Sequence, residues 1–426
     1  MLDFITYHTP IFYLIQSIWR DEAFSYFMAK PNLPQIIINT ANDFNPPLYY
    51  LFLHFWMKIV DRQDLWLRFL SVLPYIITIF FAYQLAARIF SKKFAFFVAV
   101  FTMFNPMLIY YAFEMRMYSF YVLFTISSLY FFYIKNWKWY SLTGILGLYT
   151  HSFFSLTVAS YVIYLWFTNK LNRRTLFQTL LPIIFFLPWL PILIVQFFHS
   201  SNSWLFPVDL QLIGSVLGNL FTSYEGTPGD WWNKTFILSV FIVLFFLIAL
   251  KRKRGQALLF IMPIFLPLFL ILGYSMLRRP IYVNRYMIFV TVFEIMGISL
   301  GIWCIKNRSI RNLSALLWLL SVFFINIIIS PYHKKTDFKT TFAEINKIAR
   351  PSDFIYAKTP ICFLESAYYY KYDNRVFIYN PNNITIPNYI GVNVVFPDVS
   401  KTSFPPMPSR IFLVDDDANY EMIVRR

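Results

Sequence analysis

The chain has 426 residues, of which 58% are hydrophobic, 22% aromatic and only 14% charged, and its mean hydropathy is +0.53. This composition excludes an ordinary soluble globular protein and predicts a polytopic membrane protein. The formal net charge of +16 does not indicate nucleic-acid binding, because the basic residues are concentrated in short segments between apolar runs.

Five short segments contain 15 of the 37 lysines and arginines and no acidic residue. They are residues 88–93, 135–138, 170–174, 251–254 and 306–311. Loops on the cytoplasmic side of membrane proteins carry such an excess of positive charge. We therefore expect all five segments to be cytoplasmic, and we interpret the KRKR sequence at 251–254 as a topology signal.

Apolar runs of about 17 to 25 residues, the length that crosses a membrane, separate these segments. They occupy residues 66–86, 94–112, 117–134, 176–197, 234–250, 257–273, 286–304 and 313–330. Residues 139–169 have basic segments at both ends and must cross an even number of times, as two short spans or as a re-entrant hairpin. Residues 2–18 are either a short, poorly hydrophobic span or the remnant of a better one, if Met1 is not the natural start. The prediction is about ten to eleven spans.

The order of the spans places residues 19–65 in the first external loop. Within it, residues 46–60 are too short to cross the membrane, and a crossing there would break the charge pattern. We interpret them as an interfacial helix that Asn42 or Asp43 caps at its start. Two further short helices are expected in this loop, at 22–30 and 33–40.

Three carboxylates of this loop, Asp21, Glu22 and Asp43, lie beside the membrane. Charged groups next to hydrocarbon are costly, so carboxylates that gather beside an apolar bundle indicate a functional site. The alternative for each is a structural role as a helix cap at the membrane surface.

Two further segments bring charged and aromatic side chains to the predicted outer face. The residues are Glu114, Arg116 and Tyr118 in EMRMY, and Arg278, Arg279, Arg285 and Tyr286 in RRPIYVNRYM. Arginine binds phosphate through a rigid bidentate fork, so Arg116 and Arg285 are candidates for binding an anionic lipid. The alternative is membrane anchoring, which explains most interfacial arginines and tyrosines and is our interpretation of Arg278 and Arg279.

Other features of the membrane region have both a functional and a structural interpretation. The external loop 198–233 is longer than an ordinary connection and is a candidate binding or lid element. His151 either binds an acceptor or a metal, or forms its hydrogen bonds with other residues inside the helix bundle. Gly297 and Gly301 form a GxxxG pattern, which predicts a close helix contact, and Glu294 in the same helix needs a partner.

The composition changes after residue 330. Residues 331–426 hold 10 of the 21 acidic residues and no apolar run of membrane length, so we expect an external soluble domain. Their pattern predicts helices at 336–351 and 365–372 and strands at 353–357, 375–379 and 410–414. This order is typical of a small α/β domain.

The order of several motifs resembles that of the GT-C glycosyltransferases. WRDEAFS, DFNPPLYYLFLHFW, LRFLSVL, YYAFEMRMYSF, GLYTHSFF, FLPWLP and NRYM follow one another across residues 17–330. The most similar branch is glycosyltransferase family 39, which includes protein O-mannosyltransferases and lipid A aminoarabinose transferases. The resemblance implies inverting transfer of a sugar from a polyprenyl-phosphate donor to a hydroxyl acceptor, with an aspartate of the first external loop as the base.

Carried to this chain, the resemblance makes Asp21 the general base. Glu22 is then a supporting or acceptor-binding residue, because neighbours on a helix point about 100° apart. Asp43 precedes the Pro-Pro pair where relatives have an acidic residue, although in some it comes one position later and is followed by a basic residue. Phe44 and Asn45 hold those later positions here, so Asp43 is assigned only as an acceptor contact or second carboxylate.

The same resemblance assigns the donor phosphate to arginines and tyrosines. The candidates are Arg116, Tyr118, Arg285 and Tyr286, with Glu114 and His151 as further candidates. No spacing of ligands is typical of a metal site, and a divalent metal is left open as a cofactor.

The predicted architecture is an α-helical GT-C-like membrane domain at 1–330, with interfacial helices in the loop 19–65, followed by the external α/β domain at 331–426. The expected location is the plasma or inner membrane, with the catalytic loops outside the cytoplasm. The expected partners are a polyprenyl-phosphate-sugar donor, a lipid, protein or polysaccharide acceptor and the membrane, but no nucleic acid.

Two other classes stay open. One is a glycan polymerase or ligase that uses a lipid-diphosphate oligosaccharide as its donor. The other is a flippase or transporter of lipid-linked sugars, although the paired repeats and broken midplane helices of transporters are not evident in the sequence.

Overall fold

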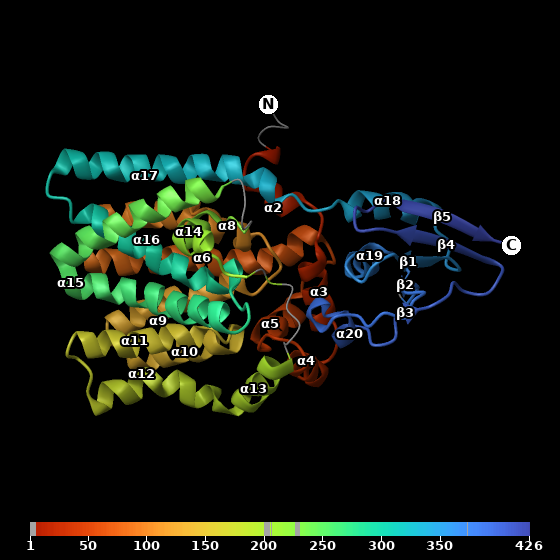
Figure 1. Cartoon of the computed structure of the whole chain (residues 1–426), viewed down its shortest axis with the longest axis horizontal. Coiled ribbons are helices and arrows are strands. Elements are labelled where there is room, and N and C mark those ends of the chain that lie inside the picture. The colour runs from red at the N-terminus through yellow and green to blue at the C-terminus, as the bar shows by residue number, and fades with distance from the viewer. Residues whose placement is uncertain (1–5, 200–204, 206, 226–230, 373) are drawn as a thin grey trace. The chain divides into compact units, whose positions relative to one another are not determined.

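The computed structural model describes residues 6–199, 205, 207–225, 231–372 and 374–426. The chain divides into two compact units. We call residues 1–12, 68–194 and 203–332 the helical unit, and residues 13–67, 195–202 and 333–426 the mixed unit. Figure 1 labels the elements of both units.

The helical unit is built from apolar helices (Figure 1). They are α6 (Asp64–Ile89), α7 (Lys92–Phe104), α8 (Pro106–Ala112), α9 (Tyr118–Tyr133), α10 (Trp137–Thr150), α11 (Phe154–Phe167), α12 (Arg173–Phe186), α13 (Leu190–His199), α14 (Leu210–Thr222), α15 (Trp232–Leu277), α16 (Ile288–Trp303) and α17 (Arg308–Ile329). By length and composition, five helices of the described chain are able to cross a membrane, or six if the bent pair α7 and α8 is one span. These helices confirm the predicted class, a polytopic helical membrane protein.

The predicted total of about ten to eleven spans exceeds these five or six helices, because the prediction also counted shorter helices and counted the two halves of α15 separately. Helices α9, α10 and α11 have 16, 14 and 14 residues, fewer than the roughly 20 that cross a typical bilayer. Helix α15 has 46 residues with a non-helical backbone at Lys253, inside the predicted loop 251–254. In the described part of residues 2–18, α2 (Ile11–Ile15) has only 5 residues and does not form a span.

The predicted single span at 94–112 is broken. Helices α7 and α8 meet at an angle of 57°. The side chain of Asn105 accepts a hydrogen bond from the main-chain N–H of Leu108, and so starts a new helix. Pro106 occupies the first turn of that helix, where its missing N–H costs nothing. This Asn-Pro pair therefore both ends α7 and redirects the chain into α8.

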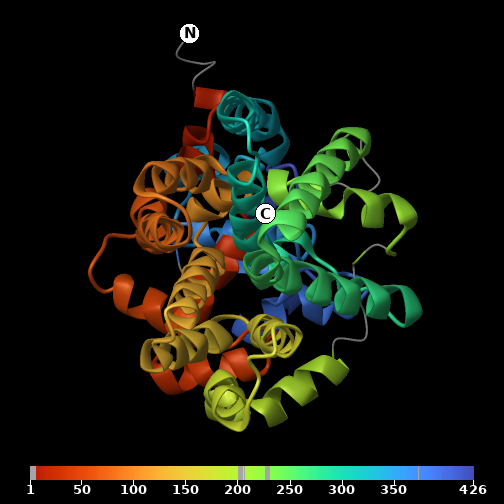
Figure 2. The same ribbon diagram turned by 90° about the vertical axis from the view of Figure 1, so that its left-hand side faces the viewer.

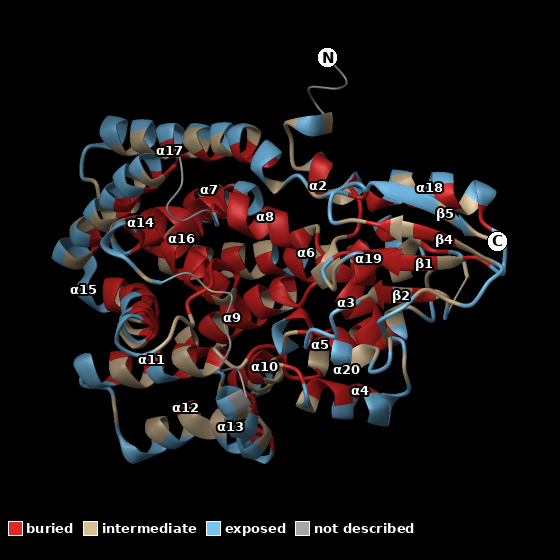
Figure 3. Cartoon of the chain, turned by 45° about the vertical axis from the view of Figure 1, so that its right-hand side comes forward, coloured by how far each residue is buried: buried red, intermediate tan, exposed pale blue. Residues whose placement is uncertain are grey.

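Helix α16 forms the centre of the helical unit. In an 18-residue apolar stretch of the span 284–303, which contains α16, 89% of the residues are buried. In the corresponding stretch of the span 308–333, which contains α17, only 28% are buried (Figure 3). Glu294 of α16 is completely buried, and its carboxylate forms no hydrogen bond with a described residue. The partner that the sequence demands for Glu294 is therefore not found among the described residues.

The predicted close contact at the GxxxG pattern is confirmed. A methyl group added to Gly297 would collide with the ring of Phe246, and one added to Gly301 with the main-chain oxygen of Phe245. Both phenylalanines belong to α15. The two glycines therefore let α15 and α16 pack with their backbones close together.

We expect Gly301→Ala to destabilise the helical unit by about 1–3 kcal/mol, because a rigid main-chain oxygen has no room to move away from the added methyl group. Gly273→Ala is the matched control, since a methyl group there would meet no atom within 4 Å. The midpoint of thermal unfolding in detergent measures the effect. Equal midpoints for the two variants would show that the contact at Gly301 is not tight.

The loop predicted at 198–233 contains an additional helix. Asp209 caps α14 by accepting a hydrogen bond from the N–H of Leu212 at 2.7 Å, and α14 packs on α15 and α16. This part of the predicted loop therefore belongs to the packed bundle. Residues 200–204, 206 and 226–230, which include Trp204 and Asp230, lie outside the described residues.

The mixed unit holds a five-stranded sheet in the order β3-β2-β1-β4-β5. The strands are β1 (Phe354–Ala357), β2 (Val376–Tyr379), β3 (Ser400–Lys401), β4 (Ser409–Val414) and β5 (Tyr420–Arg425). Neighbouring strands run parallel except for β5, which pairs antiparallel with β4. Together with α18 (Phe338–Ile348), α19 (Phe363–Tyr369) and α20 (Val392–Val395), the sheet confirms the predicted α/β fold.

The three helices predicted in the first external loop are present in the mixed unit. They are α3 (Arg20–Ala29), α4 (Leu33–Ala41) and α5 (Leu48–Trp56). The predicted cap of α5 is wrong, because α5 follows Pro47 and has no side-chain cap. Asn42 ends α4 instead. Contacts group this loop with the C-terminal segment, and the domain boundary between 330 and 331 stays a prediction.

Candidate active site

Asp21, the predicted base, lies in the first turn of α3, where the helix dipole favours a negative charge. Its side chain is 15% exposed, and the Nε atom of Arg20 lies 3.4 Å from one carboxylate oxygen. The hydroxyl of Ser25 donates to the main-chain oxygen of Asp21 at 2.9 Å, within the helix. Asp21 is therefore held on an ordered helical turn and keeps part of its side chain accessible.

Glu22 has a different environment from its neighbour. It is completely buried, and the Nζ atom of Lys335 lies 3.1 Å from its Oε2 atom. The same oxygen accepts a hydrogen bond from the N–H of Trp19 at 3.4 Å, and the Lys335 Nζ atom lies 5.3 Å from the centre of the Trp19 ring. These contacts favour the supporting role for Glu22 over the acceptor-binding role.

Asp43 lies in the turn between α4 and α5, where its N–H donates to the main-chain oxygen of Thr40 at 3.3 Å. Its side chain is buried. The alternative role of a helix cap does not apply, because Pro47 precedes α5 without a side-chain hydrogen bond. The assignment of Asp43 as a second carboxylate stays a prediction.

Glu365 of α19 is a carboxyl group that the sequence did not single out. It is buried on a helix that packs against α3. Burial raises the pKa of Glu365 to about 8, while the nearby Arg20 acts to lower it and Asp21 to raise it. Only the fold brings Glu365 near Asp21, and no local motif marks it.

The raised pKa of Glu365 predicts a pH-dependent stability. An unfolded glutamate has a pKa of about 4.3, so folding takes up a proton between this value and about 8. The stabilisation is complete below the unfolded pKa and is lost as the pH rises through the folded pKa. We expect Glu365→Gln, which is always neutral, to lose less thermal stability between pH 6 and 9 than the natural protein.

The measurement is the unfolding midpoint in detergent at both pH values, followed by intrinsic fluorescence. Glu344→Gln is the control, because Glu344 is exposed on α18 of the same unit. A Glu365→Gln variant with the pH dependence of the natural protein would rule out proton uptake at Glu365.

In the helical unit, Arg116 lies in the turn between α8 and α9. Its guanidinium carbon lies 5.8 Å from the centre of the Tyr118 ring, and its main-chain oxygen accepts a hydrogen bond from Ser71 of α6 at 3.2 Å. Arg116 and Tyr118 are both buried. The ring of Tyr118 packs against Tyr111 of α8, with centroids 4.7 Å apart.

Arg285 lies far from Arg116 in the sequence but is connected to Tyr111 through Glu225. It lies in the short 3-10 helix η2 (Asn284–Met287), and its Nη1 atom is 3.6 Å from the Oε2 atom of Glu225. The hydroxyl of Tyr111 donates to the Oε1 atom of Glu225 at 2.7 Å. Arg116, Tyr118, Tyr111, Glu225 and Arg285 therefore form one connected group, which we call the arginine cluster.

His151 and Tyr286 lie beside this cluster. The His151 ring stacks on Tyr121 with centroids 4.9 Å apart, lies 5.3 Å from the Tyr286 ring, and accepts a hydrogen bond from the N–H of Phe153 through Nδ1. His151 lies in the turn between α10 and α11, where burial and the positive charge of Arg116 lower its pKa to about 3. These contacts favour a neutral, packed histidine.

The sequence alone did not identify Tyr111 and Glu225 as members of the arginine cluster. Tyr111 and Glu225 join the two predicted arginines, and Arg68 of α6 is completely buried. Glu114, a further candidate, is also completely buried. Across the residues that the structure describes, no group of three or more His, Cys, Asp or Glu side chains is arranged to hold a metal ion.

Chemically, the arginine cluster offers two guanidinium groups and two tyrosines, a set suited to a phosphate group. Glu225 is 39% exposed and pairs with Arg285 at a distance longer than a normal hydrogen bond. An incoming phosphate would compete with this carboxylate for Arg285. In the mixed unit, considered by itself, the acidic first turn of α3 offers a carboxylate that can accept a proton.

A family model described as dolichyl-phosphate-mannose-protein mannosyltransferase matches residues 45–194. No curated protein sequence matches the chain.

Three solved structures share the fold. The structure of ArnT from Cupriavidus metallidurans in the apo state has a TM-score of 0.62 and 11% identity, and the match covers 97% of this chain and 91% of that chain. ArnT bound to undecaprenyl phosphate has a TM-score of 0.60 and 10% identity, and the match covers 97% of this chain and 92% of that chain. The oligosaccharyltransferase of Archaeoglobus fulgidus in complex with Zn and sulfate has a TM-score of 0.51 and 12% identity, and the match covers 97% of this chain and 67% of that chain.

The long apolar helices, the matching family model and the fold shared along nearly the whole chain all agree with the order of motifs in the sequence. The chain therefore shares the fold of these membrane glycosyltransferase structures, and its residues 45–194 match the model of the dolichyl-phosphate-mannose-protein mannosyltransferase family.

Proposed function

We propose that the protein transfers one sugar from a polyprenyl-phosphate donor to a hydroxyl acceptor, with inversion at the anomeric carbon. The observation that carries the proposal is the arginine cluster, in which Arg116 and Arg285 join through Tyr118, Tyr111 and Glu225. Such a cluster suits a lipid phosphate that gains charge as it leaves. The ArnT structure in complex with undecaprenyl phosphate supports the class of donor.

In the proposed reaction, the carboxylate of Asp21 accepts the proton of the acceptor hydroxyl. The acceptor oxygen forms a bond to the anomeric carbon while the bond from that carbon to the phosphate oxygen breaks. The lipid phosphate leaves with the bonding electron pair, and Arg116 and Arg285 stabilise its negative charge. A single displacement of this kind inverts the anomeric configuration.

The remaining candidates have supporting roles in this proposal. Tyr118 and Tyr286 position the two arginines from their aromatic faces. Glu22 holds the start of α3 through Lys335, and Asp43 is a second carboxylate for the acceptor. We place this chemistry on the external side of the plasma or inner membrane, as the distribution of basic loops predicts.

An assay of the purified protein in detergent tests the proposal. Radiolabelled polyprenyl-phosphate sugars and polyprenyl-diphosphate oligosaccharides are supplied as alternative donors with a mixed pool of lipid, protein and polysaccharide acceptors. We expect transfer, with release of the polyprenyl phosphate, from at least one monophosphate donor. Transfer from a diphosphate donor alone would instead assign the glycan polymerase or ligase class.

A further inference from the structure

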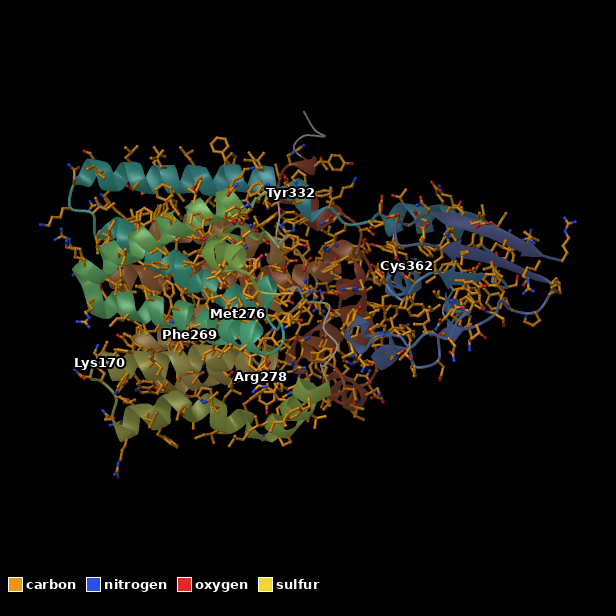
Figure 4. The ribbon with its side chains drawn as sticks, viewed as in Figure 1. Lys170, Phe269, Met276, Arg278, Tyr332 and Cys362 are labelled. Atoms are coloured by element: carbon orange, nitrogen blue, oxygen red, sulfur yellow. The ribbon has the colours of Figure 1, made fainter. Side chains whose placement is uncertain are left out.

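A cavity of the helical unit lies between the loops that connect α9 to α10 and α11 to α12. Its volume is about 460 Å³, and its rim carries Lys135, Lys170 and Arg174. We call this cavity the basic pocket. Figure 4 shows Lys170 and Arg278 at opposite ends of the helical unit, so the basic pocket is far from the turn that leads to Arg285.

The floor of the basic pocket is apolar and buried. Phe132 of α9, Leu165 of α11 and Leu259 of α15 are each at most 5% exposed and line the cavity. Trp137 and Tyr164 also line the cavity. The cavity is therefore amphipathic, because its lining combines buried apolar side chains, aromatic rings and exposed cations. Membrane proteins place aromatic residues in the same way at the level of the lipid head groups.

The positive charge at the rim is not compensated. Lys135, Lys170 and Arg174 form no ion pair with a described acidic residue, and the two loops contain no Asp or Glu. All three side chains are exposed. The N-terminus of α12 adds its partial positive charge beside Arg174. An anion that enters the basic pocket therefore displaces no described carboxylate from these cations, although the Lys170 Nζ atom lies 5.9 Å from the centre of the Tyr164 ring.

The two loops hold the backbone beside these cations in a defined conformation. At the end of α9, Asn136 donates from its N–H to the main-chain oxygen of Phe131 at 2.9 Å, and Lys135 has a left-handed φ of 58°. At the end of α11, Lys170 donates to Leu165 at 2.8 Å, and Asn169 has a left-handed φ of 53°. Both ends have the six-residue hydrogen-bonded turn that normally favours glycine at the left-handed position.

At residue 135 the chain has a lysine at a position where glycine would be less strained. The next helix after each turn is then capped by asparagine, Asn136 for α10 and Asn172 for α12. The rim of the basic pocket is therefore pre-formed, and binding an anion there needs little ordering of the backbone.

We propose that the basic pocket binds the phosphate-bearing head group of an anionic membrane lipid. The uncompensated rim recognises the phosphate, and the apolar floor beside the membrane helices accommodates the first part of the acyl chains. This assignment favours a lipid over free phosphate, because a soluble anion would make no use of the buried Phe132, Leu165 and Leu259. It does not depend on the proposed sugar transfer.

Titration of the purified protein with phosphatidylglycerol and with phosphatidylcholine, followed by native mass spectrometry, tests this inference. We expect a preference for phosphatidylglycerol in the natural protein. The triple variant Lys135→Gln, Lys170→Gln and Arg174→Gln is expected to bind phosphatidylglycerol about 100-fold more weakly, because each cation near an anionic lipid contributes roughly fivefold. If the triple variant does not fold, Lys170→Gln alone should lose about fivefold.

The matched control changes three neighbouring cations that do not line the basic pocket. Lys138→Gln, Arg173→Gln and Lys251→Gln give the same net charge and should leave binding within about twofold of the natural protein. Equal loss in both triple variants, or no loss in either, would overturn the inference. Inorganic phosphate that binds the natural protein as tightly as phosphatidylglycerol would overturn the assignment to a lipid.

Discussion

Asp21→Asn is expected to reduce kcat for sugar transfer by about 10²- to 10⁴-fold, the usual contribution of a general base. Asparagine has the same shape as aspartate and can keep the contact with Arg20, at 3.4 Å in the natural protein, but it does not accept a proton. Expression, the unfolding midpoint and donor binding should therefore be unchanged. Steady-state kinetics with the labelled lipid donor, together with a separate donor-binding assay, measure these quantities.

Asp61→Asn is the matched control for this variant. Asp61 is an exposed aspartate of the same loop, residues 19–65, so its loss removes the same charge without touching α3. We expect it to retain the kcat of the natural protein. If Asp21→Asn also retained that kcat, the base would have to be another carboxylate, with Asp43 the next candidate.

Arg285→Ala is expected to lower kcat/KM for the lipid donor by about 10- to 100-fold, the effect of losing a hydrogen bond to a charged group worth about 1.5–3 kcal/mol. The carboxylate that Arg285→Ala leaves behind, Glu225, is 39% exposed and is solvated when the arginine is absent. Because Arg285 and Arg116 are both buried, the unfolding midpoint of each alanine variant is measured beside its kinetics.

Two further variants separate phosphate binding from membrane anchoring. Arg285→Lys should recover only part of the activity, because lysine keeps the charge but not the bidentate fork. Arg278→Ala removes an exposed arginine seven residues earlier and should change neither kcat nor KM. The same modest loss for Arg278→Ala and Arg285→Ala would assign both arginines to anchoring at the membrane surface.

The helices were largely predictable from the sequence, because uninterrupted apolar runs and basic loops are local signals. The break at Asn105 was also signalled locally, by an Asn-Pro pair, but the apolar run around it masked the signal. Strands β3 and β5 were missed for a different reason. Strand β3 has only two residues, and β5 has polar residues on much of its length and depends on its pairing with β4.

The sequence indicated which charged and aromatic residues are candidates for the site, but not which residues each of them contacts. Arg116 and Arg285 were candidates because they lie in the motifs EMRMY and NRYM that carry the family resemblance. Their connection through Tyr111 and Glu225 depends on how distant helical segments pack. The pair of Glu22 and Lys335 joins residues 313 positions apart. Glu365 has no local signal at all, since its raised pKa is a consequence of burial in the folded unit.

The most direct test of the account is an experimental structure of the protein in complex with a polyprenyl-phosphate sugar, prepared with the Asp21→Asn variant to prevent turnover. The account predicts that the phosphate lies within hydrogen-bond distance, about 2.6–3.2 Å, of the guanidinium group of Arg116 or Arg285. It also predicts that residue 21 faces the anomeric carbon across a space that holds one acceptor hydroxyl. A phosphate bound away from both arginines, or a residue 21 separated from the sugar by a wall of protein, would contradict it.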